Sequence, residues 1–471
     1  MRGPPGWARA GPSPDGIPRD RPPAPGTRHA DDTRSAPRPA NLGTPEDGAA
    51  PAGVDEDPVT NLRVFRWAVV ALIVFGVVVV ACGGTDDPTS RSVSNPLVRG
   101  NGATPATTPP VVIKTVPGMP PVVDPTNLYS ETTATKVLDF VRDDLPRVYV
   151  PNRAENTVSV IDPNTMQVID KFPVGINPQH IVPSWDMKTL WVTNTAEGRT
   201  DGSLTPIDPQ TGKRSGPDVP VDDPYNMYFS PDGKSAIVVA EAYKRLDFRD
   251  PKTMALQKSV ETPNCGGVNH GEFAIDGTWA IFTCEFAGAL VKIDMTTGQV
   301  VSYLQLTGGG MPQDIRLSPD GTMLYVAEMV RSGVYLVDPV TFTEKGFIPT
   351  GTGAHGLYPS RDASVLYVAN RGSTRIGGPP NGQGSVSVLD WRNGNKIVAT
   401  WPTPGGGSPD MGGVSADGTK LWLAGRYDNE VYAIDTRTGE YAVIPVGREP
   451  HGLAVWPQPG RYSLGHTANM R

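Results

Sequence analysis

A unit of about 45 residues recurs along the chain from Arg147 onward, and this periodicity constrains the fold more than any other feature. In each copy, a run with the pattern of a β-strand ends in Asp. The copies end at Asp162, Asp208, Asp250, Asp294, Asp338, Asp390 and Asp435. Spacings of this size are typical of propeller blades. We expect each Asp carboxylate to accept hydrogen bonds from backbone N–H groups in the turn that follows.

A second pattern alternates with the first. It begins with a polar residue that usually follows Pro by two positions, continues as an apolar strand, and closes in Ser-Pro-Asp-Gly or a relative of it, as in PYNMYFSPDG at residues 224–233. The Asp-Gly turn leads into another strand, such as LYVAE or LWLAG, which predicts a hairpin. A fourth strand, such as VIDKFPV (168–174), follows the Asp of the first pattern. Each unit therefore contains four strands: A begins at the polar residue, B follows the Asp-Gly turn, C runs to the Asp, and D follows it.

The order of these strands predicts how the ring closes. Asp162 precedes the first A strand, and no C strand follows His451. The sequence therefore predicts an all-β fold: a seven-bladed β-propeller of four-stranded antiparallel blades over residues 147–457. Its first blade is closed by the N-terminal B, C and D strands together with the C-terminal A strand, which leaves no sheet edge exposed at the junction.

Several segments carry a family resemblance: LWVTN (190–194), VYVPNRAENTVSVIDP (148–163), LYVANRG (366–372) and IPVGREPHGLAV (444–455). They resemble the YVTN-family (YncE-like) repeat of β-propeller proteins, here in an exported lipoprotein form. The resemblance covers about residues 147–457 and implies the propeller fold. It leaves the function open, because the family includes surface proteins, binding proteins and relatives of enzymatic propellers.

The residues before the repeats have a different character. Residues 1–60 are rich in Pro and Gly and predict a disordered prefix, which an over-long gene model would explain. Residues 61–82 hold two arginines, an apolar run and Cys82, and resemble a lipoprotein signal with Cys82 as the lipidated residue. An uncleaved signal-anchor helix is the alternative. Residues 83–130 read as a Thr/Pro-rich linker, 131–146 as a lead-in, and 458–471 as a C-terminal tail at the surface.

Either form of the signal predicts a protein at the cell membrane that faces outside the cytoplasm. The membrane is then a partner of the chain, through the lipid anchor or through the anchor helix. The net charge of −7 argues against a nucleic-acid partner.

The geometry of a propeller predicts where a binding site lies. Strand A is innermost, so its opening residues surround the mouth of the central channel, and the ends of the B strands lie on the same face. We assign all four histidine openers to one repeat position. The predicted ligand-binding residues are His180, Asn226, His270, Asp314, His355, His451, Glu285 and Glu328, with Met411 completing the ring.

The histidines raise the question of a metal. Imidazole is a common ligand for copper and zinc, and the predicted metal ligands are His270, Asp314, His180 and His451. We expect opposite histidines to lie about 10 Å apart, too far to share one ion at ligand distances of roughly 2 Å. Alternatively, the imidazoles are structural and bond to the loops of neighbouring blades. No cofactor is assigned with certainty.

Two cysteines belong to one blade. Cys265 precedes strand A and Cys284 ends strand B, so both lie at the same face, and an oxidising compartment predicts a disulfide between them. The alternative is a free or metal-ligating Cys284 beside Glu285 and His270.

The chain contains no G-x-S-x-G elbow, H-E-x-x-H helix or P-loop. The sequence therefore predicts an extracytoplasmic, membrane-tethered propeller that binds a protein or a small molecule through its histidine-rich face. The alternatives are a copper-dependent oxidoreductase or hydrolase that uses the same face, and a lactonase-like propeller enzyme.

Overall fold

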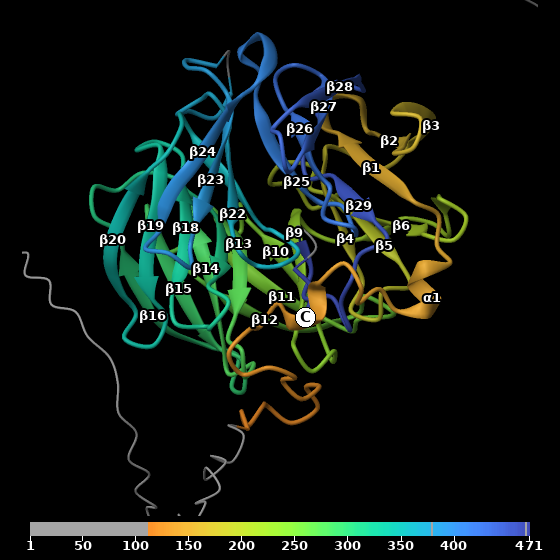
Figure 1. The fold of residues 1–471 in the computed structure, drawn as a ribbon. Helices are drawn as coiled ribbons and strands as arrows, with labels where there is room; N and C mark the ends of the chain where they lie inside the picture. Colours follow the sequence, from red (N-terminus) through yellow and green to blue (C-terminus); the bar gives the residue numbers. More distant parts are fainter. Residues whose placement is uncertain (1–111, 378–379, 467–468) are drawn as a thin grey trace, which may run out of the picture. The chain divides into compact units, whose positions relative to one another are not determined.

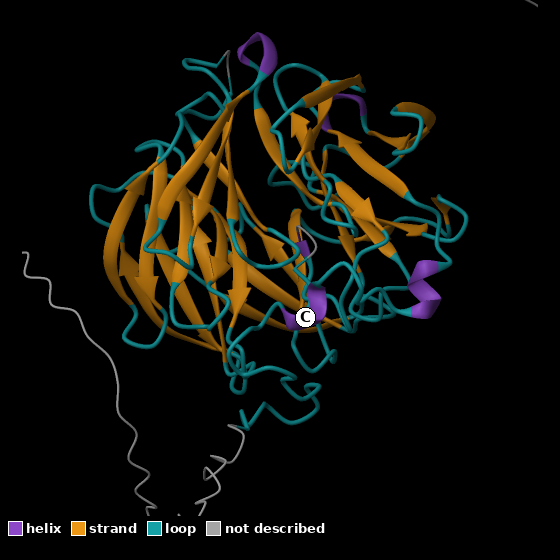
Figure 2. Ribbon diagram, viewed as in Figure 1, coloured by secondary structure: helices purple, strands orange, loops and turns teal. Residues whose placement is uncertain are grey.

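The computed structural model describes residues 112–377, 380–466 and 469–471, and these fold as a seven-bladed β-propeller (Figures 1 and 2). The predicted fold class is confirmed. The helical elements that can be delimited within the described residues are α1 (Asp139–Arg142) and the short 3₁₀ turns η1 (Ser130–Thr132), η2 (Arg153–Glu155) and η3 (Pro404–Gly406). The predicted prefix, the signal segment with Cys82, and the linker up to residue 111 lie outside the described residues. Within those residues, no helix is long and apolar enough to cross a bilayer.

Each blade runs from an innermost strand A to an outermost strand D. The first blade comprises β29 (Ala454–Trp456), β1 (Arg147–Asn152), β2 (Thr157–Asp162) and β3 (Gln167–Pro173). The second comprises β4 (Pro178–Pro183), β5 (Leu190–Asn194), β6 (Ser203–Asp208) and a D strand divided into β7 (Lys213–Arg214) and β8 (Val219–Pro220). The third comprises β9 (Pro224–Phe229), β10 (Ala236–Ala240), β11 (Arg245–Arg249) and β12 (Leu256–Glu261).

The fourth blade comprises β13 (Val268–Phe273), β14 (Trp279–Cys284), β15 (Ala289–Asp294) and β16 (Gln299–Gln305), and the fifth comprises β17 (Pro312–Leu317), β18 (Leu324–Glu328), β19 (Gly333–Asp338) and β20 (Thr343–Pro349). The sixth comprises β21 (Ala354–Pro359), β22 (Leu366–Asn370), β23 (Ser385–Asp390) and β24 (Lys396–Pro402). The seventh comprises β25 (Pro409–Val414), β26 (Lys420–Gly425), β27 (Glu430–Asp435) and β28 (Tyr441–Pro445).

The ring closes as predicted. Strand β29 pairs antiparallel with β1, with Val148 opposite Val455 and Tyr149 opposite Ala454. The last strand of the propeller thus supplies the innermost strand of the first blade. The apolar core lies between the blades, where side chains such as Tyr149, Trp422 and Trp456 are fully buried.

The turns follow from the repeated polar residues. Asp338 accepts hydrogen bonds from the backbone N–H groups of Val340 and Thr341 at 2.9 and 3.0 Å. At the A–B turn, Ser318 Oγ donates to Asp320 at 2.6 Å, and Gly321 takes a positive φ of 72°. These bonds fix the tight turns at one end of every blade, which we call the turn end. The opposite end is the mouth.

The asparagine that ends strand B in segments such as LWVTN and LYVAN has a structural role. Asn370 Nδ2, at the end of β22, donates to Ser385 Oγ at 3.1 Å and to Ser387 Oγ at 2.9 Å, both on β23. Asn152 and Asn194 make the equivalent bonds in their blades. This asparagine therefore joins strands B and C and does not face the channel.

Both flanking segments pack at the turn end. Leu128 and Tyr129 are buried against the fifth blade, where Tyr129 Oη donates to the carbonyl of Leu317 at 2.8 Å. The C terminus lies beside this N-terminal segment (Figure 1), and the guanidinium of Arg471 lies 5.8 Å from the centre of the Tyr129 ring.

The prediction that the tail is a surface appendage is wrong. Leu464, Met470 and Arg471 are buried, and the backbone carbonyl of Leu464 accepts a hydrogen bond from the N–H of Phe229 at 3.0 Å. The sequence of the tail does not indicate a core segment because it carries no repeat. The tail nevertheless fills the turn end of the channel.

Candidate functional site

The innermost strands carry an irregularity near the mouth. In β4, Pro178 pairs with Asn194 and His180 pairs with Thr193, so Gln179 is an extra residue. The same shift of register occurs near the start of β9, β13, β17, β21 and β25. Such a bulge interrupts the alternation of side chains. Two successive residues of each strand can then face the channel.

These residues form two layers. The mouth layer consists of the second residue of each innermost segment, namely Gln179, Tyr225, Asn269, Gln313, His355, Asp410 and His451. The deep layer consists of the next residue, namely His180, Asn226, His270, Asp314, Gly356, Met411 and Gly452.

The prediction that the four histidines share one repeat position is therefore wrong. His180 and His270 belong to the deep layer, whereas His355 and His451 belong to the mouth layer. The ring centroids of His180 and His270, from the second and fourth blades, are 5.7 Å apart, and those of His355 and His451, from the sixth and first blades, are 6.1 Å apart. The separation of about 10 Å was expected for histidines on opposite sides of the channel, and it stays a prediction for those pairs. Imidazoles from blades that are not neighbours meet in the channel because their side chains reach inward from both sides.

A cavity of about 250 Å³ opens at the mouth. Most of its wall comes from two equivalent positions of the repeat. The mouth layer supplies Gln179, Tyr225, Gln313, His355 and His451, and the residue directly after strand B supplies Arg153, Thr195, Glu241, Glu285, Arg371 and Arg426. The insertion at residues 373–384 adds Ile376.

Asp410 is the charge centre beneath this cavity. Its carboxylate is fully buried and lies 2.8 Å from His355 Nδ1, 3.5 Å from His451 Nε2, and 3.8 and 3.7 Å from the guanidinium groups of Arg371 and Arg426. Burial opposes its ionisation, but His355, Arg371 and Arg426 hold the pKa of Asp410 well below its usual value. Burial also lowers the pKa of His355 to about 4, so at neutral pH the balancing positive charge comes from the two arginines.

A pair of carboxyl groups forms another part of the wall. Burial raises the pKa of Glu241 well above its usual value, and the nearby Glu285 raises it further. Burial also raises the pKa of Glu285, although Gln313 and Asn269 donate hydrogen bonds to its two oxygens at 2.9 and 2.7 Å. Two adjacent buried carboxyls do not both ionise readily, so this wall can donate a proton as well as accept hydrogen bonds.

Below the mouth, three imidazoles come together. The ring centroid of His466 lies 4.0 Å from that of His180 and 4.7 Å from that of His270. All three side chains are fully or almost fully buried. Burial lowers the pKa of each ring well below its usual value, so all three are neutral at pH 7.

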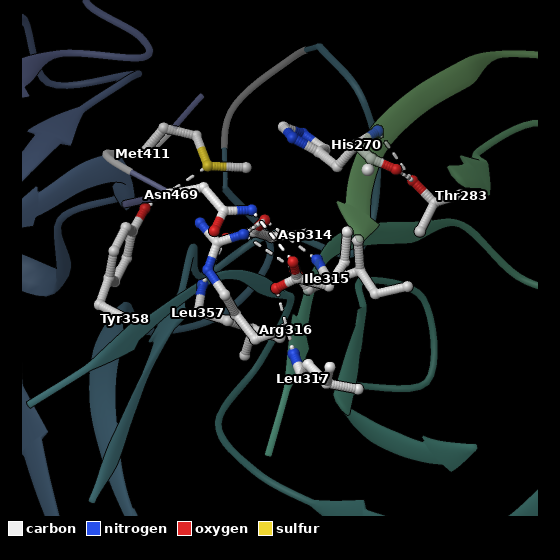
Figure 3. Close-up of polar contacts among 12 residues, drawn as sticks. His270, Thr283, Asp314, Ile315, Arg316, Leu317, Leu357, Tyr358, Met411 and Asn469 are labelled. Carbon is white, nitrogen blue, oxygen red and sulfur yellow. Dashed lines mark hydrogen bonds and ion pairs between the residues drawn. The ribbon is translucent and has the colours of Figure 1, made fainter. Parts of the chain in front are cut away.

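Asp314 does not join these histidines, although it was predicted to bind metal beside His270. Its oxygens accept hydrogen bonds from the N–H groups of Ile315 and Leu357 at 3.0 and 2.9 Å, and Arg316 lies 3.2 Å away (Figure 3). Burial raises the pKa of Asp314 to about 6, and Arg316 opposes that shift. The carboxylate ties the fifth and sixth blades together.

Other predicted site residues have structural surroundings. Asn226 Nδ2 lies 3.4 Å from His270 Nδ1. Met411 Sδ accepts a hydrogen bond from Tyr358 Oη at 3.5 Å (Figure 3). Glu328 does not line the mouth cavity, because its carboxylate accepts hydrogen bonds from the N–H groups of nearby backbone, including that of Met311 at 2.6 Å.

Cys265 and Cys284 are joined by a disulfide in the structure, and both are fully buried. Glu285 follows Cys284 directly and reaches the cavity. The disulfide therefore holds the B strand of the fourth blade where it delivers this carboxyl group to the wall.

Sequence reasoning missed Asp410, His466 and the arginines Arg153 and Arg371. The signal for the arginines was present, since each follows the asparagine of a B strand in the segments PNRAEN and ANRGS. In each segment the asparagine bonds to the neighbouring strand, and the arginine after it faces the cavity. Asp410 stands next to the chosen Met411, where the bulge makes neighbours equivalent. No sequence pattern indicates the position of His466.

Comparison with known proteins agrees with this architecture. The model of the YNCE-like beta-propeller family matches residues 110–459. No curated protein matches the sequence significantly. A putative 6-phosphogluconolactonase from Bacteroides uniformis superimposes with a TM-score of 0.54 at 17% identity, over 66% of this chain and 99% of that one. A functionally unknown protein from Desulfotomaculum acetoxidans gives a TM-score of 0.52 at 16% identity, over 66% and 99%. At these identities, the likeness extends to the fold alone.

Proposed function

The chain belongs to the YNCE-like β-propeller family, and on this premise we propose that it is a binding protein that holds a small anionic molecule in the cavity at the channel mouth. The observation that carries the proposal is the pair of buried guanidinium groups of Arg371 and Arg426 in the wall of that cavity. Buried arginines with donors directed into a hollow are suited to carboxylate and phosphate groups.

The charge around these arginines supports the proposal. Arg153, on the same wall, forms ion pairs with Glu197 and Glu449. Arg371 and Arg426 share the single carboxylate of Asp410, at distances longer than a direct hydrogen bond. An anionic group of a ligand would complete their coordination.

The opposite wall adds specificity. The Glu241 and Glu285 pair retains a proton when its pKa values are raised, and Gln179 and Gln313 present amide groups. Hydroxyl groups of a ligand would find both donors and acceptors there. The volume of about 250 Å³ lies just below the range of roughly 300–1,000 Å³ usual for ligand pockets. The ligand class is therefore a small polyhydroxylated acid or a small phosphate ester.

The test is calorimetric titration of the purified protein with gluconate, malate, glucose 6-phosphate and 6-phosphogluconate. We expect binding of at least one compound, weakened more than tenfold by Arg371→Gln. Arg392→Gln is the matched control, because Arg392 is exposed at the turn end, where it donates to the carbonyl of Asp362. If no compound binds below millimolar concentration, or if both variants bind equally well, the proposal fails.

The cellular setting is part of the same proposal. We place the propeller outside the cytoplasm, anchored at the membrane through a lipid on Cys82. The signal-like segment at residues 61–82 supports this location, and so does the disulfide between Cys265 and Cys284, because such bonds persist in oxidising compartments. Mass spectrometry of the membrane-extracted protein should find a lipid adduct on Cys82, and Cys82→Ser should release the protein. An N terminus that begins upstream of an unmodified Cys82 would refute the lipid anchor.

Catalysis is an alternative outcome of these experiments. Lactone hydrolysis would be suggested only by the names of similar folds, and no contact in the cavity favours it over binding. Incubation of the protein with glucono-1,5-lactone, followed by the release of acid, separates the two. Acid release that depends on Glu285 would replace the binding proposal with an enzymatic one.

A further inference from the structure

The deep layer contains a group of side chains that the mouth cavity does not use. One nitrogen from each of His180, His270 and His466 lies within 4.8 Å of the others. Two of these rings come from innermost strands of different blades, and the third comes from the C-terminal tail. They meet in the channel below the mouth layer.

The hydrogen bonding of His180 and His270 is incomplete. Within the described part of the chain, neither ring nitrogen of His180 has a hydrogen-bond partner, and neither has Nε2 of His270. Both side chains are fully buried. A buried polar atom without a partner carries the cost of its lost hydration. A central group that accepts a lone pair from a nitrogen of each ring would offset this cost.

The tail is held so that His466 must lie at this point. Arg471 Nη2 donates to Glu272 Oε1 at 2.5 Å, and Asn469 Nδ2 donates to the same oxygen at 3.2 Å. On the other side, Ser463 Oγ donates to the carbonyl of Pro183 at 3.0 Å. Anchors on both sides of His466 leave little freedom to this part of the backbone.

Two glycines make the close approach feasible. A Cβ on Gly452 would lie 1.9 Å from His180 Nδ1, so a side chain there would displace the imidazole. A Cβ on Gly465 would lie 2.6 Å from the carbonyl oxygen of Met227, and Gly465 has a φ of +122°. Both positions must be glycine for the rings to occupy their places.

We propose that His180, His270 and His466 form a three-histidine site for a single Zn²⁺ or copper ion. Nitrogen ligands without a thiolate, and with no carboxylate in the group, favour these ions over Mg²⁺, Ca²⁺ and Mn²⁺. Nitrogen atoms on one ion at bonds of roughly 2.0–2.1 Å stand about 3.5 Å apart. The observed spacing reaches that value through small rotations of the side chains.

The site has both a compensating charge and an entry. The Asp410 carboxylate lies near enough to act on the ring charge of His180 and His270, and it would balance part of the charge of the ion. His451 lines the mouth cavity, and its ring centroid lies 4.7 Å from that of His180. An ion that enters through the mouth would pass this ring. The inference is independent of the ligand proposed for the mouth.

A second group of possible metal ligands serves as the control for this assignment. His355, Asp410 and His451 also have ligand atoms within 4.8 Å of one another, in the mouth layer. Arg371 and Arg426 already lie about this carboxylate and supply positive charge. A cation is therefore disfavoured at the mouth, and the deep group is the one that we assign.

The experiment uses the untagged full-length chain, stripped with EDTA and dialysed against Zn²⁺, with metal content measured by mass spectrometry. We expect one Zn²⁺ per chain, with affinity at least 100-fold weaker in His466→Gln. The control His355→Gln should bind as the wild type does. Absence of stoichiometric Zn²⁺ or copper overturns the proposal, and so does binding that His355→Gln abolishes while His466→Gln retains it.

A second measurement does not depend on the folding of any variant. Loaded with one equivalent of Cu²⁺, the wild-type protein should give an electron paramagnetic resonance spectrum with hyperfine coupling from several imidazole nitrogens. A spectrum without nitrogen coupling would contradict the assignment. Both readouts are independent of gluconate or phosphate-ester binding, so failure of the metal site and failure of the mouth site are distinguishable.

Discussion

The imidazole rings of His180 and His466 have centroids 4.0 Å apart, and they reach this contact from opposite directions. His180 is carried by an innermost strand near the mouth, whereas His466 enters with the tail from the turn end. The channel of this propeller is thus filled from both ends. The experiments that follow test the consequences of that packing.

Gly465→Ala should destabilise the protein because the tail can no longer bend into the channel. The new methyl group would lie 2.6 Å from the carbonyl oxygen of Met227, at a φ of +122°. We expect a loss of about 2–4 kcal/mol in the free energy of unfolding, measured by urea denaturation. Gly394→Ala is the control, since Gly394 also has a positive φ but no atom lies within 4 Å of the added Cβ. Equal losses in the two variants would contradict the close approach.

Acid should destabilise the protein between about pH 6.5 and pH 4. Burial lowers the pKa of His355 from 6.5 to about 4, so over this range the unfolded chain binds a proton that the folded chain does not. The stability that this residue contributes is present above pH 6.5 and is lost as the pH falls, by about 2–3 kcal/mol between pH 7 and pH 4.5. The pKa values of His180, His270, His451 and His466 are also lowered and act in the same direction.

The buried acids Asp314, Glu241 and Glu285 act in the opposite direction, because their raised pKa values keep protons on the folded chain. The histidines outnumber them, so the net stability should rise with pH. His355→Gln should reduce the loss between pH 7 and pH 4.5 by about 2–3 kcal/mol, as followed by denaturation at each pH. An unchanged pH profile in His355→Gln would contradict a neutral buried ring.

Removing the disulfide should weaken the fourth blade. Cys265 and Cys284 are separated by 19 positions, and closing a loop of this length contributes about 3 kcal/mol. The double variant Cys265→Ala, Cys284→Ala should lose about this much in the free energy of unfolding. Dithiothreitol should produce a similar loss in the wild type and none in the variant. A wild type that is indifferent to dithiothreitol during unfolding would argue against the bond.

Asn370→Ala should cost about 2–3 kcal/mol, because it removes the bonds from strand B to Ser385 and Ser387 and leaves their hydroxyls buried. Ligand affinity should be retained, since the residue does not line the cavity. Asn381→Ala is the control: Asn381 is exposed in the insertion and, among the described residues, exchanges hydrogen bonds with Thr374. Thermal unfolding and titration of both variants would reveal a role in binding if affinity fell without a loss of stability.

The blades could be predicted from the sequence because they repeat. The assignment of each histidine to the mouth layer or the deep layer could not be predicted from residue type. In GAHGLYPSRD the histidine stands five positions before Ser360, whereas in PQHIVPSWD it stands four positions before Ser184. Counting from the turn would have separated His355 from His180. Alignment by residue type places them together, because a bulge lets both face the channel. Residue type alone therefore does not give the depth of a side chain.

The tail shows a different limit. Its burial depends on Glu272, Pro183 and Phe229, which belong to three separate blades. Contacts of this kind leave no periodicity in the sequence of the tail. The disulfide was foreseeable because both cysteines belong to one hairpin, where local geometry fixes their distance. Glu241 and Glu285 occupy equivalent positions after their B strands, but the contact between them joins two blades and depends on how the blades pack.

Closure by β29 has a consequence for the making of the protein. Strand β1 is synthesised long before β29, its innermost neighbour, and His466 follows β29 along the chain. The first blade therefore stays open until β29 has emerged from the ribosome. A chain that stopped before Ala454 would lack both the closing strand and the third imidazole of the trio.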